Sequence, residues 1–229
     1  MSVDVVHVVV PAHDEEELVG ACLASISTAS AQLGAAVPGV VVRATVVLDR
    51  CHDGTAAVVA AYGVDTVVVD AANVGVARAA GVDRVRALAA GQPPERVLVA
   101  STDADCVVPD AWLVDLHAQA TAGHELVVGA VHPDPADLPV GVVERWRARH
   151  HRPEAHVHGA NLAFTLAAYL HAGGLQPVGL HEDVLLVEAM RAAGCRWTTA
   201  TSVQTSGRTT GRVRGGFATY LADLVAQPE

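Results

Sequence analysis

Short apolar runs alternate with longer mixed segments along the first half of the chain. Four of these runs lie at residues 8–10, 40–42, 56–61 and 97–100. Charged residues, Gly or Pro bound the runs, as expected of buried parallel strands and of the helices that cover them. None approaches the roughly 18 uninterrupted apolar residues of a membrane-spanning helix. The pattern therefore predicts no transmembrane segment.

Read in order, the pattern predicts strands that alternate with helices. Strands are expected at 5–10, 40–48, 66–69 and 97–100, and helices at 15–31, 56–62 and 77–90. The acidic residues Glu15, Glu16 and Glu17 are expected in the first turn of the first helix, where the helix dipole favours them. This alternation is typical of a parallel sheet with helices on both faces.

The second half is less regular. Helices are expected at 111–122, 142–152 and 182–193, and a strand at 126–131. The segment 205–216 is rich in Gly, Thr and Arg and has no predicted element. No repeat or linker divides the chain, so we expect one domain.

Composition agrees with one sizeable core, because 51% of the 229 residues are apolar and the mean hydropathy is +0.33. The net charge of −10 disfavours nonspecific binding to nucleic acid or anionic membranes, which needs basic surface. All 15 basic residues are Arg, which excludes lysine Schiff-base and P-loop chemistry. The four cysteines form no CxxC and are expected to be reduced, buried thiols. Without a basic leader at the N-terminus, we expect a soluble cytoplasmic protein.

Polar residues follow each predicted strand, and ligands of parallel sheets bind beyond the carboxyl ends of the strands. The most telling group is Asp103-Ala104-Asp105, directly after the fourth strand. Two carboxylates at this spacing suit a shared Mg²⁺ or Mn²⁺, or a cation and a sugar hydroxyl. A polar turn that caps the next helix is the alternative, and the residues alone leave both readings open.

Five motifs in a fixed order make the pattern more specific. They are Pro11-Ala12-His13-Asp14-Glu15-Glu16, Asp49 with Asp53-Gly54-Thr55, Asn73-Val74-Gly75 with Arg78 and Gly81, Asp103-Ala104-Asp105, and Glu182-Asp183. This order resembles the GT-A fold nucleotide-sugar glycosyltransferases of family 2, over roughly residues 5–197. The resemblance implies an α/β fold with a Rossmann-like, mostly parallel central sheet and helices on both faces.

The resemblance also implies roles for individual residues. Asp183 matches the catalytic base of inverting members, and Glu182 would share that role or orient the acceptor. Asp105 is the expected first metal ligand, with Asp103 and His158 as further candidates. The nucleotide-diphosphate sugar would be bound by Pro11, Ala12, Glu15, Asp49, Asp53, Arg78, Asp103 and Ala104, with Arg208 and Arg212 closing over it as part of a basic lid that also holds Arg214.

These assignments divide the single domain 1–229 into three parts. Residues 1–105 would bind the nucleotide sugar, residues 106–204 would hold the acceptor and the base, and residues 205–229 would be a flexible basic tail. The chain lacks the Gln-x-x-Arg-Trp motif of processive members of the family. We therefore expect a metal-dependent, single transfer to a small-molecule or lipid acceptor.

Several alternatives stay open. A nucleotidyltransferase would also bind a nucleotide and a metal on an α/β sheet, and a noncatalytic nucleotide-binding module would need no base. The cluster His150, His151, His156 and His158 is a second metal hypothesis, for zinc, although it lacks an H-E-x-x-H motif. The sequence does not distinguish inversion from retention or name the donor, and a homodimer is one expected assembly.

Overall fold

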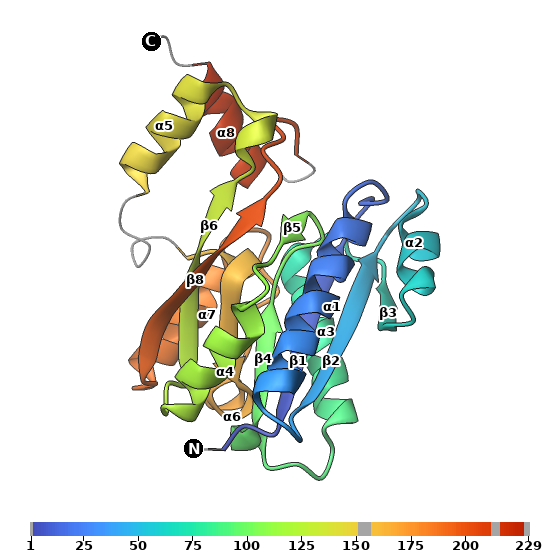
Figure 1. Cartoon of the computed structure of the whole chain (residues 1–229), viewed down its shortest axis with the longest axis vertical. Coiled ribbons are helices and arrows are strands. Elements are labelled where there is room, and N and C mark those ends of the chain that lie inside the picture. Colours follow the sequence, from blue (N-terminus) through green and yellow to red (C-terminus); the bar gives the residue numbers. More distant parts are fainter. Residues whose placement is uncertain (1, 151–156, 212–215, 227–229) are drawn as a thin grey trace.

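One eight-stranded sheet runs through the computed structural model, which describes residues 2–150, 157–211 and 216–226 (Figure 1). The strand order is β3-β2-β1-β4-β7-β6-β8-β5. The strands are β1 Val5–Ala12, β2 Val41–Asp49, β3 Asp65–Val69, β4 Val97–Ser101, β5 Cys106–Val107, β6 Leu126–Pro133, β7 Leu162–Thr165 and β8 Trp197–Thr205.

The sheet is mostly parallel, as the sequence predicts. β1 pairs in parallel with β2 and β4, β2 pairs in parallel with β3, and β6 pairs in parallel with β8. β7 runs antiparallel between β4 and β6, and β5 runs antiparallel to β8. Every residue of β1 and β4 is buried, because both faces of the central sheet are covered.

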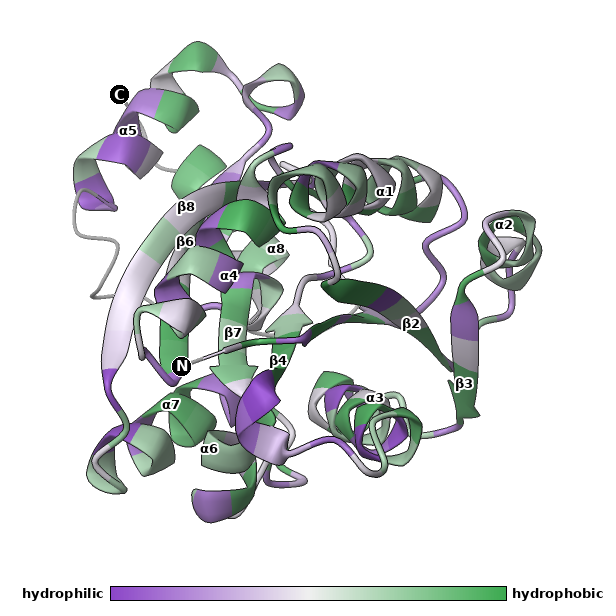
Figure 2. Ribbon diagram, turned by 60° about the horizontal axis from the view of Figure 1, so that its bottom comes forward, coloured by the Kyte–Doolittle hydropathy of each residue, from purple (hydrophilic) through white to green (hydrophobic). Residues whose placement is uncertain are grey.

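Helices cover the two faces of the sheet (Figure 2). On one face lie α1 (Val19–Ala36) and α4 (Trp112–Thr121), and on the other lie α3 (Val74–Leu88), α6 (Leu166–His171) and α7 (Glu182–Ala192). The short α2 (Thr55–Ala61) packs beside α1. Each face has its own apolar core, with Trp112 in one and Phe164 in the other.

The first helix begins four residues later than expected. α1 starts at Val19, and its first turn contains no acidic residue, so the predicted placement of Glu15–Glu17 is wrong. The backbone N–H of Glu15 donates to Thr55 Oγ1 (2.7 Å), and the N–H of Glu16 donates to Asp53 (3.1 Å). These contacts with the β2–α2 loop hold the segment out of the helix and outweigh the dipole preference.

Two helices form a cap at one end of the molecule, apart from the main layers (Figure 1). They are α5 (Val140–Arg149) and α8 (Phe217–Val225). The cap has its own small apolar cluster, made of Leu138, Val142, Val143, Trp146, Leu221 and Leu224. The sequence pattern predicted a helix at 142–152 but a flexible tail over residues 205–229, yet residues 217–225 form a helix whose Leu221 and Leu224 are buried.

Among the described residues, α1 is the one helix whose length and composition would suffice to cross a membrane. This is weak support for a membrane segment, because a core helix passes the same test. Leu23, Ile26 and Leu33 of α1 belong to the apolar core on this face of the sheet.

Candidate active site

A cavity of about 580 Å³ opens at the carboxyl ends of β1, β2 and β4. The starts of α3 and α7 and residues of α8 complete its wall. The structure brings together here most of the predicted site residues, including Pro11, Ala12 and Ala104. The carboxylates that line it are those of Glu15, Asp49, Asp103, Asp105, Glu182 and Asp183.

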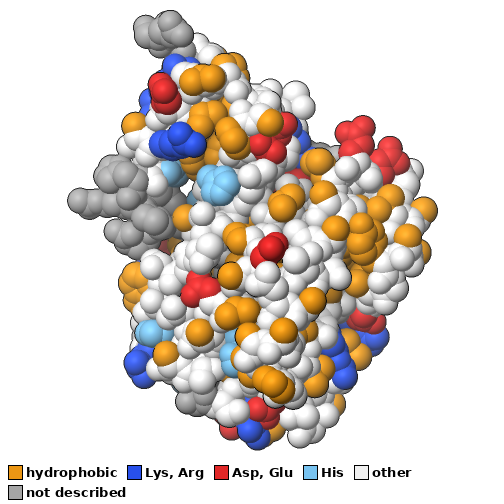
Figure 3. All heavy atoms as spheres, in the orientation of Figure 1, with side chains coloured by type: hydrophobic (Ala, Val, Ile, Leu, Met, Phe, Trp, Pro, Cys, Tyr) orange, Lys and Arg blue, Asp and Glu red, His pale blue; other side chains and the backbone are white. Residues whose placement is uncertain are grey.

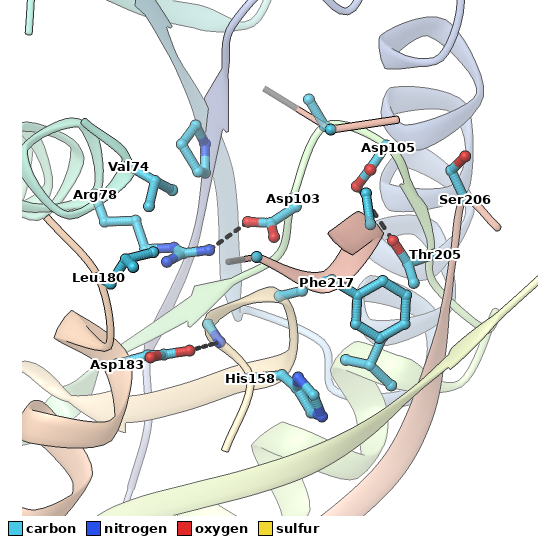
Figure 4. Close-up of a pocket in the computed structure, with 18 of the residues that line it drawn as sticks. Val74, Arg78, Asp103, Asp105, His158, Leu180, Asp183, Thr205, Ser206 and Phe217 are labelled. Carbon is cyan, nitrogen blue, oxygen red and sulfur yellow. Dashed lines mark hydrogen bonds and ion pairs between the residues drawn. The ribbon is translucent and has the colours of Figure 1, made fainter. Parts of the chain in front are cut away.

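Arg78 connects the two halves of the site. Its guanidinium donates to Asp103 Oδ1 (2.5 Å), as Figure 4 shows, and also to Glu182 Oε1. Burial opposes the charge of Arg78, but the nearby carboxylates of Asp103 and Glu182 outweigh it and raise the pKa of the guanidinium. The resemblance implies that Arg78 binds the nucleotide sugar, at its diphosphate or its base. Arg78 lines the cavity, and its largely buried guanidinium also ties the β4 end to the start of α7.

Gly159 makes room for this bridge. A Cβ atom at Gly159 would lie 2.4 Å from Cζ of Arg78, far inside the contact distance. Any larger residue would therefore displace the guanidinium from its two carboxylates.

Arg208 reaches the cavity from the segment after β8. Its guanidinium donates to both carboxylate oxygens of Glu15 (2.7 and 2.8 Å) and lies 2.8 Å from Oδ2 of Asp105. Burial and the nearby charge of Asp103 raise the pKa of Asp105 to about 6, although Arg208 works in the opposite direction. Arg208 thus partly neutralises a pair of buried carboxylates.

Asp183 lies at the start of α7 and faces the cavity. Its Oδ2 accepts a hydrogen bond from the backbone N–H of Gly159 (2.7 Å), as Figure 4 shows, and its Oδ1 accepts one from the N–H of Val184 (2.8 Å). Both contacts fix the orientation of the carboxylate. The neighbouring Glu182 is buried against Arg78, so Asp183 is the better placed of the two to meet a substrate.

Two predicted donor-binding carboxylates hold loops. Asp49 accepts hydrogen bonds from the backbone N–H groups of Ala71, Ala72 and Asn73, each at 2.8 Å, and so shapes the loop before α3. Asp53 does not line the cavity; it accepts from the N–H of Thr55 (2.9 Å) and braces the β2–α2 loop.

Of the predicted histidine and tail residues, the structure describes only some. His158 lines the cavity, where its ring lies edge-on to Phe217 at 6.1 Å, and no group of three metal-ligating side chains occurs among the described residues. Arg212, Arg214, His151 and His156 lie outside the described residues, so the lid and the four-histidine zinc hypothesis stay predictions.

The donor set nevertheless fits a hard divalent cation. In the described part of the chain the cavity wall carries six carboxylates against three arginines, Arg78, Arg149 and Arg208. Mg²⁺ and Mn²⁺ prefer oxygen, and Mg²⁺ often takes one or two protein carboxylates and completes its shell with phosphates and water. Asp105, with Asp103 nearby, fits this pattern and needs no third side chain.

Two further residues of the site were not predicted from sequence. Thr205 Oγ1 donates to Asp105 Oδ1 (3.3 Å), and Ala72 lines the cavity with a left-handed backbone (φ 47°). Such a conformation is uncommon outside glycine and often occurs at functional sites. No sequence signal marks Ala72, because alanine does not favour this conformation.

Comparison with known proteins agrees with this architecture. Residues 7–164 match the family described as Glycosyl transferase family 2. The search of curated proteins gave no match.

Solved structures with the same fold are distant in sequence. S. aureus TarS superposes with a TM-score of 0.64 at 12% identity, over 90% of this chain and 37% of that one. Glucosyl-3-phosphoglycerate synthase from Mycobacterium tuberculosis, in complex with Mn²⁺, UDP and glucosyl-3-phosphoglycerate, gives 0.61 at 20% identity, over 99% and 81%. This chain thus spans little more than a third of TarS. Because the family match covers most of its length, the chain belongs to glycosyl transferase family 2.

Proposed function

We propose that the chain is a metal-dependent glycosyltransferase. It moves a sugar from a nucleotide-diphosphate sugar to a hydroxyl group of a small-molecule or lipid acceptor, one sugar at a time. Mg²⁺ or Mn²⁺ is the proposed cofactor.

One observation carries this proposal. The strand-end carboxylates of Asp103 and Asp105 and the carboxylate of Asp183 line the same cavity, although they come from different halves of the chain. The carboxylates of the cavity would repel a negatively charged diphosphate. The chain has no lysine to offset this repulsion, so we infer that a divalent cation lies between the carboxylates and the diphosphate. When bound, the cation would neutralise the diphosphate leaving group.

The residues of the chain supply the remaining steps. Asp183 accepts the proton of the acceptor hydroxyl, whose oxygen then bonds to the anomeric carbon while the bond from that carbon to the diphosphate oxygen breaks. The products are the glycosylated acceptor and the nucleoside diphosphate. Arg78 and Glu182 are buried and contact each other, and Arg78 also contacts Asp103. This pair therefore holds Asp103 and the start of α7 in place.

The neighbours are consistent with this choice of ligands. One synthase structure contains Mn²⁺ and UDP, and a TarS structure (residues 1–349) contains UDP. The absence of the processive Gln-x-x-Arg-Trp motif from the sequence supports a single transfer.

The test begins with calorimetry of UDP, GDP and ADP, each with and without Mn²⁺. The nucleotide that binds most tightly determines which nucleotide sugars are then tested as donors. Each donor is assayed for release of the nucleoside diphosphate with Mn²⁺, Mg²⁺ or EDTA. We expect Asp183→Asn to lower the rate of transfer by at least about 100-fold with nucleotide affinity unchanged. Asp105→Asn should weaken nucleotide binding only when Mn²⁺ is present. Asp83→Asn, at an exposed position on α3, is the matched control.

Two outcomes would overturn the proposal. One is that no nucleoside diphosphate binds under any of these conditions. The other is that Asp183→Asn transfers sugar as fast as the unchanged protein. Release of pyrophosphate from a nucleoside triphosphate would point to a nucleotidyltransferase.

A further inference from the structure

A second cavity, of about 440 Å³, lies beside the acidic one. Its wall comes from β6, β8 and α5, and it shares four lining residues with the first cavity: Val131, Trp146, His150 and His158. The shared residues place the two cavities side by side.

The two cavities differ in charge. No acidic residue lines the second cavity in the described part of the chain, whereas Arg147 and three histidines do: His132, His150 and His158. On the outer surface at this end of the molecule, arginine and histidine side chains lie among acidic and apolar ones (Figure 3). The field in the second cavity is thus the more positive of the two.

Two carboxylates lie in the neighbouring loop. Asp134 accepts from Nε2 of the lining residue Gln204 and from the N–H of Ala136, both at 2.8 Å. Asp137 accepts from the N–H of Gly207 at 2.7 Å. Neither aspartate lines the second cavity, so the charged groups on its described wall are basic.

The rest of the wall suits a compact organic molecule. Val131, Val143 and Trp146 present apolar surface, while Ser202 and Gln204 add polar groups. Small-molecule sites commonly combine mainly apolar walls with a few polar groups that fix orientation.

We propose that the second cavity is the acceptor site, and that it selects a small, water-soluble acceptor bearing a phosphate or carboxylate group. This inference rests on the proposed glycosyl transfer. The six carboxylates of the first cavity repel an anion, so the charged end of the acceptor lies near Arg147 and its hydroxyl extends toward Asp183. The separation also keeps the acceptor's charge away from the donor diphosphate.

Binding measurements test the site without relying on turnover. The protein is first saturated with Mn²⁺ and its nucleoside diphosphate, which fills the donor side. Inorganic phosphate, glycerol 3-phosphate and neutral glycerol are then titrated by calorimetry. We expect both anions to bind and glycerol not to bind. Arg147→Gln should raise both anion dissociation constants at least about fivefold, because it removes a charge-assisted contact.

The control is Arg86→Gln on the exposed surface of α3, which should leave anion binding unchanged. The acceptor proposal is overturned if neither anion binds, if glycerol binds as well as glycerol 3-phosphate, or if Arg147→Gln has no effect. Preference for a lipid phosphate in vesicles over glycerol 3-phosphate would overturn it too. In all these cases intact nucleotide binding would leave the proposed function standing.

Discussion

At the scale of single residues, Arg208 supplies a positive charge between two carboxylates. It contacts Glu15 and Asp105, whose side chains are both largely buried. A metal ion at the proposed ligand Asp105 would compete with this guanidinium for the same oxygen. We therefore expect Arg208 to weaken metal binding before the nucleotide arrives.

Replacing Arg208 tests this competition. Arg208→Gln keeps a polar, although shorter, side chain and removes the positive charge, so the site becomes more negative. We expect the dissociation constant for Mn²⁺, without nucleotide, to fall by about threefold to tenfold, which corresponds to roughly 0.7–1.4 kcal/mol. The electron paramagnetic resonance signal of free Mn²⁺ measures it, with Arg86→Gln as the control. An unchanged or weaker Mn²⁺ affinity would contradict the competition.

The buried position of Asp105 predicts that the free energy of unfolding depends on pH. Its pKa in the folded chain is about 6, above its ordinary value, so the folded state binds the proton more tightly. The stabilisation from the protonated Asp105 carboxyl is fully present below about pH 4 and is lost as the pH rises through 6. Ionisation of Asp105 therefore lowers the free energy of unfolding by an amount on the order of 2–3 kcal/mol.

Asp105→Asn should therefore stabilise the fold at pH 8, by about 1–3 kcal/mol after loss of the contact with Arg208. The gain should shrink toward zero below pH 4. Urea unfolding at several pH values measures it, beside Asp83→Asn. A lower unfolding free energy for Asp105→Asn at pH 8 would show that the ionised carboxylate is not destabilising.

At the scale of elements, the first half of the fold was well predicted from sequence. β1, β2, β3 and β4 each begin within one residue of the expected start, because uninterrupted valine-rich runs leave little choice. β8 was missed, since its alternating burial and threonines resemble a polar loop. β7 and α6 were missed as well, being only four and six residues long.

The candidate site was likewise predicted from sequence only in part. Strand-end carboxylates could be predicted, because a parallel sheet brings its carboxyl ends to one edge. The partners of these groups could not. Arg78 meets Glu182 across 104 positions of the sequence, and Arg208 meets Glu15 across 193. Such pairs depend on how the whole chain folds, and no local pattern encodes them.

The close approach of α3 to β1 leaves no room for a side chain at Gly81. A Cβ atom at Gly81 would lie 2.3 Å from Cγ1 of Val9, so Gly81→Ala forces the helix away from β1. We expect a loss of about 1–3 kcal/mol in unfolding free energy. Gly34→Ala in α1 is the matched control, because nothing lies within 4 Å of the added atom. It should stabilise the protein by up to about 1 kcal/mol. Equal effects of the two substitutions in chemical denaturation would refute the close approach.

At the scale of the whole molecule, the cap formed by α5 and α8 packs on its own apolar cluster. Its buried residues belong to neither of the two cores that flank the sheet, and Phe217 packs against both this cluster and one of those cores. Regions with small, separate cores tend to open locally at a lower free energy than the rest of a protein. The cap also carries Arg147 and part of the wall of both cavities.

Two leucine truncations separate the cap from the body. Leu221 in the cap and Leu98 in β4 are both fully buried. Leu98→Ala should lower the global unfolding free energy by about 2–5 kcal/mol. Leu221→Ala should instead accelerate hydrogen exchange in α5 and α8 and leave the midpoint of global unfolding nearly unchanged. A global loss in Leu221→Ala as large as that in Leu98→Ala would mean that cap and body unfold together.

The pairing of β5 with β8 has a consequence for the order in which the molecule matures. Cys106, directly after Asp105, pairs with Thr205, and the N–H of Ser206 donates to the carbonyl of Asp105 (3.1 Å). The ribosome makes Asp105 about a hundred residues before these partners, while β1 to β4 need nothing beyond residue 101 to pair with one another. A nascent chain can therefore pair these four strands early, yet the turn that carries Asp105 is held by β8 only after residue 206 has been made. The acidic cavity is thus completed about a hundred residues later than the strands that position it.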